Sequence, residues 1–333
     1  MARCVKSLVI LPALGSVGPG TVAYMARAFR FGIGIANGLS ADPIALAQRA
    51  EQSGFDVAVI GDHIGPELAP MPTLAAIGAA TRSIQLGTMV LNADLRNPVQ
   101  LAWEAATINR LSGGRFELGL GAGHTPQEYR ATGRTHEPAA VRKRRLMEAV
   151  EIIGKLLAGQ TVTSRGEFFN VADACVTEPG WAPPILVGGN GAALLEHAGR
   201  HADIIGLQGL GRTLDDGHRH AVRWSTEHLE RQLEQIRTGA GDRFDQIELS
   251  ALVQIVRITD DAEAAIAELC NRVPSLAPAD VIDSPYALFG TVDEVADKLE
   301  RCRNRWGITY VVVRDHDQFE PVMNRLRAER AEQ

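Results

Sequence analysis

The chain has 333 residues, of which 45% are hydrophobic and 22% charged, and its formal net charge is -6 at pH 7. This composition is typical of a globular protein and argues against a surface that binds nucleic acid or an anionic membrane, since there is no long basic run and only 5% of residues are aromatic. The cysteines form no CxxC pair, which indicates reduced thiols and a cytoplasmic protein; they are Cys4, Cys175, Cys270 and Cys302.

The first residues carry a weak targeting signal. Arg3 and Lys6 precede an apolar stretch over residues 8–14, as in a secretory signal peptide, but Pro12 interrupts this stretch and it is too short to span a bilayer. We interpret residues 1–28 as a disordered N-terminal extension and residues 29–330 as a single domain. A signal peptide is the alternative for the extension.

Eight apolar segments alternate with helical segments along the predicted domain. We expect strands over residues 31–36, 56–60, 84–90, 115–120, 185–188, 203–207, 248–258 and 310–313. These segments are apolar throughout, as expected for parallel strands that are buried on both faces. Eight strand–helix units predict an α/β fold, a closed (β/α)8 TIM barrel. A Rossmann fold is the alternative, but His124 stands where GxGxxG would need its last glycine.

Local signals predict where two helices begin. Asp42 and Pro43 supply an N-cap carboxylate and a first-turn proline, and Thr291 with Glu294 forms a capping box. Three further segments are expected to be a hairpin, a long charged helix and a loop, over residues 159–173, 216–237 and 274–285 respectively.

The segment LSGGRFELGLGAG, Leu111 to Gly123, is the most distinctive of the chain. It reads as a turn, a buried strand and then glycines at alternate positions, of which Gly121 and Gly123 follow the strand. Glycines at the carboxyl end of a strand allow a flat ligand to approach the backbone, and active sites of (β/α) proteins lie at that end. Close packing between strands is the alternative reason for the same glycines.

Histidines at the strand ends are the candidate catalytic groups. Asp62 and His63 directly follow the second strand, and a histidine there can exchange the proton of a substrate group while a hydride leaves the carbon that carries this group. The alternative is that Asp62 caps the next segment and His63 is a structural hydrogen-bonding group. His124 follows the glycine run and is the second catalytic candidate.

A second glycine-rich segment follows the fifth strand. Gly188, Gly189, Asn190 and Gly191 precede a short helix, and consecutive N–H groups at a helix start bind anions such as phosphate. In barrels, phosphate often lies at a late strand end, which matches this position. A plain glycine-rich turn would give the same pattern.

Several other charged and histidine-containing segments are less informative. The basic run over residues 142–145 is either a solvated helix face or a contact for an acidic cofactor tail. His197 and His201 are spaced i, i+4 but form no HExxH pattern, and His218 and His220 lie in a charged segment, so the sequence predicts no metal site.

Four stretches together resemble the luciferase-like monooxygenase superfamily of flavin and deazaflavin enzymes, over nearly the whole chain after the extension. They are AEQSGFDVAVIGDH, IQLGTMVLNADLRNPVQLAWEAATINRLSGGRFELGLGAGHTPQEY, PILVGGNGAALLEHAGRHADIIGL and FGTVDEVADKLERCRNRWGITYVVVR. The branch that uses coenzyme F420 is the most similar, because its fourth strand often ends in GLGAG followed by an EY pair, here Glu128 and Tyr129.

The resemblance implies a TIM barrel of the bacterial luciferase-like type that binds its ring at the strand ends. It implies that the peptide around Thr88 and Met89 presses on the ring, in some relatives through a cis bond, and that the cofactor phosphate lies near Gly188 and Gly189. The predicted cofactor-binding residues are Asp62, Thr88, Met89, Gly121, Gly123, Gly188, Gly189, Asn190 and Gly191.

The resemblance also implies an activity. His63 matches the histidine that relatives acting on alcohols place beside the hydride-carrying carbon of the ring. His124 matches a glutamate general acid of the sugar-phosphate dehydrogenases, a departure that argues against a sugar-phosphate substrate. We therefore expect a homodimeric oxidoreductase that transfers a hydride between coenzyme F420 and a small organic substrate. An FMN-dependent monooxygenase and a non-catalytic flavin- or deazaflavin-binding protein are the alternatives.

Overall fold

The computed structural model describes residues 27–214 and 219–331. The predicted extension therefore lies almost wholly outside the described residues, as do Cys4 and His218. Cys175, Cys270 and Cys302 are free thiols, as predicted. Within the described ranges, every helix is too short or too polar to span a lipid bilayer.

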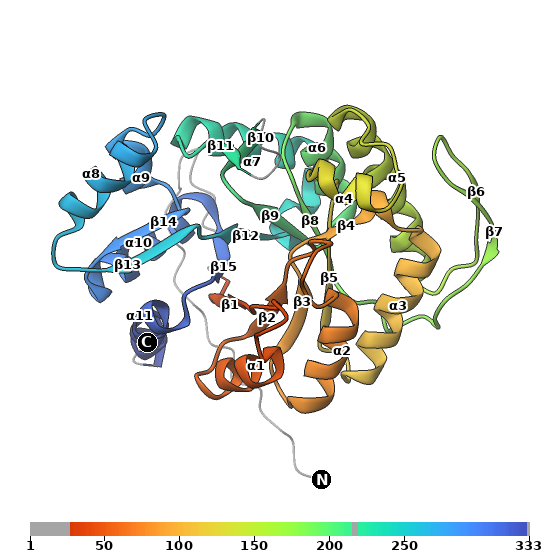
Figure 1. Cartoon of the computed structure of the whole chain (residues 1–333), viewed down its shortest axis with the longest axis horizontal. Coiled ribbons are helices and arrows are strands. Elements are labelled where there is room, and N and C mark those ends of the chain that lie inside the picture. Colours follow the sequence, from red (N-terminus) through yellow and green to blue (C-terminus); the bar gives the residue numbers. More distant parts are fainter. Residues whose placement is uncertain (1–26, 215–218, 332–333) are drawn as a thin grey trace, which may run out of the picture.

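Parallel strands form a closed barrel at the centre of the molecule (Figure 1). They are β1 (Arg30–Gly34), β2 (Val57–Ile60), β3 (Gln85–Thr88), β5 (Phe116–Gly121), β8 (Ile185–Gly188), β9 (Ile204–Leu207), β12 (Glu248–Leu252) and β15 (Ile308–Val313). The order around the barrel is β3-β2-β1-β15-β12-β9-β8-β5, and pairing of β3 with β5 closes it. Each of the eight predicted strand segments contains one barrel strand, and the closed order confirms the TIM barrel and excludes the Rossmann alternative.

Helices surround the barrel (Figure 1). They are α1 (Pro43–Gln52), α2 (Pro70–Ala80), α3 (Pro98–Leu111), α4 (Pro126–Ala131), α5 (Ala139–Leu157), α6 (Ala192–His201), α7 (Thr226–Ala240), α8 (Ala262–Arg272), α9 (Pro278–Asp283), α10 (Val292–Trp306) and α11 (His316–Ala331). Both predicted caps are confirmed: the Asp42 side chain accepts a hydrogen bond from the Ala45 N–H, and Thr291 and Glu294 form a reciprocal capping box.

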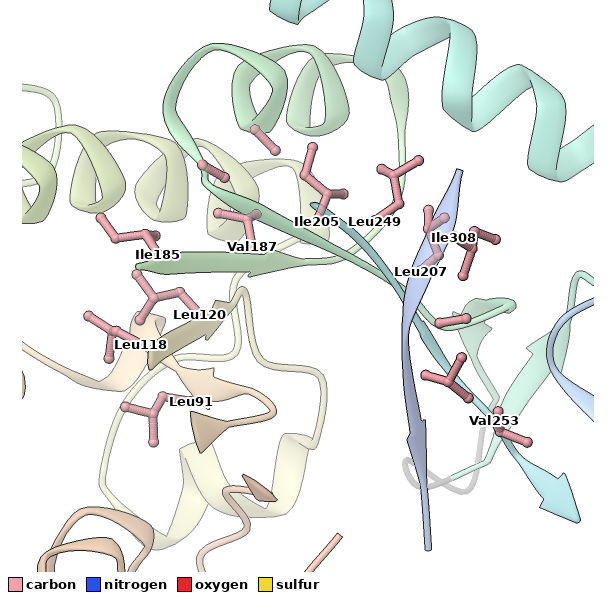
Figure 2. Close-up of a cluster of buried hydrophobic side chains, with 14 of the residues drawn as sticks. Leu91, Leu118, Leu120, Ile185, Val187, Ile205, Leu207, Leu249, Val253 and Ile308 are labelled. Carbon is pink, nitrogen blue, oxygen red and sulfur yellow. The ribbon is translucent and has the colours of Figure 1, made fainter. Parts of the chain in front are cut away.

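The strands are buried on both faces. Outward-facing side chains such as Leu118, Val187 and Ile205 pack beneath the helices in one large core (Figure 2). Inward-facing side chains such as Val57 and Tyr310 form a smaller second cluster inside the barrel. This two-sided burial explains why the strand sequences are apolar throughout rather than alternating.

A buried polar network lies toward the amino-terminal ends of the strands. The Arg30 guanidinium donates hydrogen bonds to Glu117 at 2.6 Å and to Glu248 at 2.8 Å, and the Tyr310 hydroxyl donates to Glu117 at 2.7 Å. Each buried charge is therefore paired, as buried charges must be. The opposite, carboxyl-terminal end of the barrel carries the cavity described below.

Two predicted elements of the second half were only partly right. The predicted helix over residues 216–237 begins only at Thr226, as α7, which Ser225 caps with its side chain. Residues 216–218 lie outside the described residues, and β11 (His220–Val222) instead pairs antiparallel with β10 (Leu210–Thr213). The segment 248–258 is not one strand: β12 stays in the barrel, whereas β13 (Ile255–Ile258) pairs with β14 (Ala287–Gly290) outside it. Pairing with another strand decides both outcomes.

Smaller elements complete the fold. The predicted hairpin is confirmed as β6 (Val162–Arg165) and β7 (Asn170–Ala174), which projects beside α3 and α5 at the right of Figure 1. The predicted loop 274–285 contains α9. The third strand ends at Thr88, the Met89–Val90 peptide is cis, and β4 (Leu91–Asn92) then pairs with β5. Two short 3-10 helices are η1 (Ala93–Leu95) and η2 (Gly241–Gln246).

Candidate functional site

A cavity of about 520 Å³ lies at the carboxyl ends of the barrel strands. Segments that follow β2, β3, β5, β8, β9 and β15 line it, which is the usual position of a TIM-barrel active site. The predicted site residues in its wall are Asp62, His63, Met89, Gly121, Gly123, His124, Gly188, Gly189 and Asn190. Residues predicted from separate strand ends therefore line the same cavity.

Thr88 and Gly191 lie beside the cavity wall rather than in it. The Thr88 side chain is buried, donates to the Gly119 carbonyl at 2.9 Å and accepts from the Gly119 N–H at 2.8 Å. Gly191 has a φ of +96° and is the N-cap of α6. Both residues shape the backbone next to the cavity.

His63 is hydrogen-bonded to a buried carboxylate. Its Nδ1 lies 2.9 Å from Oε1 of Glu128 on α4; the histidine side chain is 52% exposed and the glutamate side chain 5%. The hydrogen bond to Glu128 raises the pKa of His63 above its ordinary value, against the effect of burial. Burial is the largest influence on the pKa of Glu128 and would raise it, but the hydrogen bond and charge of His63, together with Asn92 and His124, outweigh burial and the pKa is lowered. With Nδ1–H donated to Glu128, the His63 Nε2 is left to accept a proton.

Two further histidine rings continue from His63. The His124 ring lies 5.6 Å from that of His63 and 4.6 Å from that of His220, measured between centroids. Burial, followed by the neighbouring His220 and His63, lowers the pKa of His124 to about 4. His124 is therefore neutral near pH 7. The sequence did not single out His220, because only the β10–β11 hairpin brings it to this cavity.

A chain of buried hydrogen bonds supports the His63–Glu128 pair. The Asp62 carboxylate accepts from the Arg96 guanidinium and, at 2.8 Å, from the Asn92 N–H. The Asn92 side-chain amide in turn reaches Oε2 of Glu128 at 3.5 Å. The oxygens of Asp62, which we expected to contact a cofactor, are thus hydrogen-bonded to protein groups. Asp62 holds the Asn92 segment in position below the histidine.

The alternating glycines are explained by strand packing, the alternative that the sequence had left open. A Cβ added to Gly121 would lie 2.6 Å from Cγ2 of Val90, and one added to Gly123, whose φ is +67°, would lie 2.3 Å from Oδ1 of Asn92. The glycines therefore make room for the segment around the cis peptide, which packs against the end of β5. Their backbone still forms part of the cavity wall.

A basic wall lies on the α5–α6 side of the cavity. The Lys143 ammonium donates to the Asn190 carbonyl at 2.7 Å and to its side-chain oxygen at 3.1 Å, directly beside the N-terminus of α6. Burial, and then the charge of Arg142, lowers the pKa of Lys143. Arg212 and Arg314 also line the cavity. This arrangement of cations and helix N-terminus suits an anionic group.

The basic run 142–145 is not a uniform solvated face. Arg142 is buried and donates to the carbonyls of Ala122 and Gly123, so it ties α5 to the end of β5. Arg145 is paired with the buried Asp94, whereas Arg144 is exposed and paired with Glu167. The run therefore divides into Arg142 and Lys143, which line the cavity, Arg145, which pairs with a buried carboxylate, and Arg144, which faces solvent.

Comparison with known proteins gives a family and several named relatives. A family model of the luciferase-like monooxygenases matches residues 22–276. The F420-dependent glucose-6-phosphate dehydrogenase of Amycolatopsis mediterranei is 31% identical over 243 residues, which cover 69% of this chain and 68% of that protein. The protein of the same name from Kribbella flavida is 29% identical over 318 residues, covering 91% and 88%.

Solved structures share the fold. An F420-dependent secondary alcohol dehydrogenase in complex with an F420–acetone adduct matches with a TM-score of 0.71 and 20% identity, covering 90% of this chain and all of that one. The coenzyme F420-dependent tetrahydromethanopterin reductase of Methanopyrus kandleri matches with a TM-score of 0.67 and 21% identity, covering 89% and 97%. Because the family model spans most of the barrel and the relative from Amycolatopsis agrees, this chain belongs to the luciferase-like monooxygenase family.

Proposed function

We propose that this chain is an F420-dependent oxidoreductase in which a hydride moves between coenzyme F420 and a carbon of a small organic substrate, while His63 exchanges the proton. The observation that carries the proposal is the His63–Glu128 pair in the wall of the strand-end cavity. The names of the relatives from Amycolatopsis and Kribbella support the choice of cofactor. Hydride acceptance or donation is the chemistry that bound F420 would supply.

The cavity residues fit such a cofactor. Met89, Val90 and Leu91 give one wall an apolar surface, and the glycine-lined ends of β5 and β8 expose backbone nearby, which suits a planar ring. Lys143 and the N-terminus of α6 would hold its phosphate, and Arg212 would lie within reach of acidic groups farther along it.

His63 would act as the acid/base through Nε2. In substrate oxidation the neutral ring takes the hydroxyl proton, and Glu128 stabilises the imidazolium that forms through the existing 2.9 Å contact at Nδ1. In reduction the imidazolium returns that proton. The neutral His124, beside His63, would orient the substrate oxygen by a hydrogen bond rather than by charge.

The substrate proposed is an alcohol or carbonyl compound. His124 occupies the position at which sugar-phosphate dehydrogenases carry a glutamate, and a histidine whose pKa is about 4 cannot supply the same anionic or acidic group near pH 7. A secondary alcohol or ketone needs no more than His63, a hydrogen-bonding neighbour and the apolar wall.

Titration of the purified protein with F420 and, separately, with FMN tests the proposal by fluorescence. We expect F420 to bind tightly and FMN weakly, and turnover of alcohols with F420 to fall by at least about 100-fold in His63→Ala with F420 binding retained. Preferential FMN binding with flavin- and oxygen-dependent product formation would instead establish the monooxygenase alternative. F420 binding without turnover of alcohols, aldehydes or activated alkenes would establish a cofactor-binding protein.

We also propose that the chain forms a homodimer through the α3 face. Trp103 is 63% exposed and Leu111 73% exposed on this helix, and large apolar side chains exposed together are typical of an interface. Light scattering after size-exclusion chromatography should give twice the chain mass, and Trp103→Arg should give the monomer. A monomeric wild-type protein would contradict this assignment.

A further inference from the structure

A second group of histidines lies on the outside of the barrel, where α5 packs against α6. Nε2 of His197 lies 3.0 Å from Oε1 of Glu151, and Nε2 of His201 lies 3.9 Å from the same oxygen. The two imidazole rings are 4.4 Å apart between centroids. None of the three residues lines the cofactor cavity. Two imidazoles and a carboxylate therefore converge outside the proposed active site.

We propose that Glu151, His197 and His201 form a binding site for Zn²⁺ that joins α5 to α6. The three donor atoms already lie within 4.8 Å of one another. In a tetrahedral site with bonds of about 2.0–2.2 Å, donor atoms are about 3.3–3.6 Å apart, so shifts of no more than about 1 Å would bring the side chains into position. A water molecule would complete the coordination, since Glu151 and His201 are open to solvent.

The placement on the helices favours metal binding over chance proximity. His197 and His201 are one turn apart on α6, so both rings project from the same face, and Glu151 comes from a different helix. Imidazole ligands with a single carboxylate favour Zn²⁺ over Mg²⁺ or Ca²⁺, which prefer several oxygen ligands.

The bound ion would tie together the two helices that frame the basic wall of the cavity. Lys143 lies eight residues before Glu151 on α5, about 12 Å along the helix, and already contacts Asn190 just before α6. Zinc would add a second link between the same helices. The site is thus assigned a structural role rather than a part in hydride transfer.

Calorimetric titration of the full chain with ZnCl₂, after removal of metal with a chelator, tests this assignment. We expect one equivalent of Zn²⁺ to bind and to raise the unfolding temperature by about 3 °C or more at saturating metal. Glu151→Gln, which is nearly isosteric, and His201→Ala, at a half-exposed side chain, should each weaken binding by at least about 100-fold, since even outer partners of a metal ligand are worth 10- to 100-fold.

The control is His228→Ala, a histidine on α7 outside the group, which should leave Zn²⁺ affinity unchanged. With Co²⁺ in place of Zn²⁺, wild-type protein should show the visible absorption of a tetrahedral site and both variants should lose it. Absence of saturable Zn²⁺ binding would overturn the proposal. So would binding that persists in Glu151→Gln and His201→Ala, or that is lost in His63→Ala instead.

Discussion

Two histidine–glutamate pairs among the described residues have nearly the same N···O distance, but the pKa values of their histidines shift in opposite directions. His63 lies 2.9 Å from Glu128 at the barrel mouth, and His197 lies 3.0 Å from Glu151 between α5 and α6. The pKa of His63 is raised because the hydrogen bond to Glu128 is the largest influence on it. The pKa of His197 is lowered because burial of the ring outweighs its bond to Glu151.

The difference lies in which partner is buried. At the mouth the carboxylate is 5% exposed and the imidazole 52% exposed, whereas between the helices the imidazole is 7% exposed and the carboxylate 45%. A buried carboxylate stabilises a cation formed on an exposed ring, but a buried ring resists acquiring charge. The first arrangement suits proton exchange with a substrate. The second keeps an imidazole neutral, the form that binds metal ions.

Removing the charge of the buried carboxylate should have the largest effect. We expect Glu128→Gln to lower kcat/KM about 100-fold, because the imidazolium of His63 loses its counter-charge while a hydrogen bond of similar geometry remains possible. The pKa of His63 should fall, so the acid limb of the pH–rate profile for alcohol oxidation should move to lower pH. Steady-state kinetics from pH 5 to 9 would measure both changes.

The control for this variant is Glu67→Gln, which removes an exposed charge that also raises the pKa of His63 but accepts no hydrogen bond from it. We expect its kcat/KM to stay within about twofold of wild type, since exposed charges interact weakly across water. Equal losses in the two variants, or an unmoved acid limb in Glu128→Gln, would contradict the role given to the pair.

The next largest effect is expected from His124→Gln, on the pH dependence of the free energy of unfolding. Its pKa is about 4 in the folded chain, against 6.5 for an ordinary histidine. As pH falls from 6.5 to 4, the unfolded chain binds a proton that the folded chain does not, so the free energy of unfolding decreases. His124→Gln should remove about 1–2 kcal/mol of that decrease, after allowance for partial exposure of the ring. Urea denaturation at a series of pH values would measure it.

His63→Gln provides the opposite case within the same cavity. The pKa of His63 is raised, so its contribution to stability is fully present below pH 6.5 and is lost as pH rises through the folded pKa. Replacing His63 should therefore make the free energy of unfolding fall more steeply toward acid pH, whereas replacing His124 should make it fall less steeply. The same sign of change in both variants would refute the assigned pKa directions.

The sequence predicted the barrel because each strand carries its own local signal. The segment 185–188, for example, is short, apolar and bounded by Pro184 and Gly189, and β8 lies there. The helix expected over residues 216–237 was wrong in its first part for the complementary reason, whereas α7 confirms it from Thr226 on. The charged residues of the first part resemble a helix, but the pairing of His220 with Thr213 and of Val222 with Leu210 makes β11 a strand, which their own pattern does not reveal.

The residues of the candidate site could likewise be predicted only where the local sequence carries a signal. Positions directly after strands, such as His63 and Gly188, could be predicted to meet at one end of the barrel. Glu128 was visible only through the EY pair of the resembled family, because nothing in its neighbourhood indicates that α4 carries it back to His63. Glu151 lies 46 residues from His197 in the chain, so the i, i+4 histidines alone did not indicate a third ligand.

The smallest effect is expected from the exposed carboxylate of the second pair. In metal-free buffer, Glu151→Gln should change the free energy of unfolding by no more than about 0.5 kcal/mol, because Glu151 is half-exposed and glutamine can still accept a hydrogen bond from Nε2 of His197. The pKa of His197 should fall further, since the bond and charge of Glu151 oppose the effect of burial. Nuclear magnetic resonance of the histidine rings would follow that pKa. If the pKa of His197 rose instead, Glu151 rather than burial would be the group that keeps the ring neutral. The contrast between the two histidine–glutamate pairs would then need another cause.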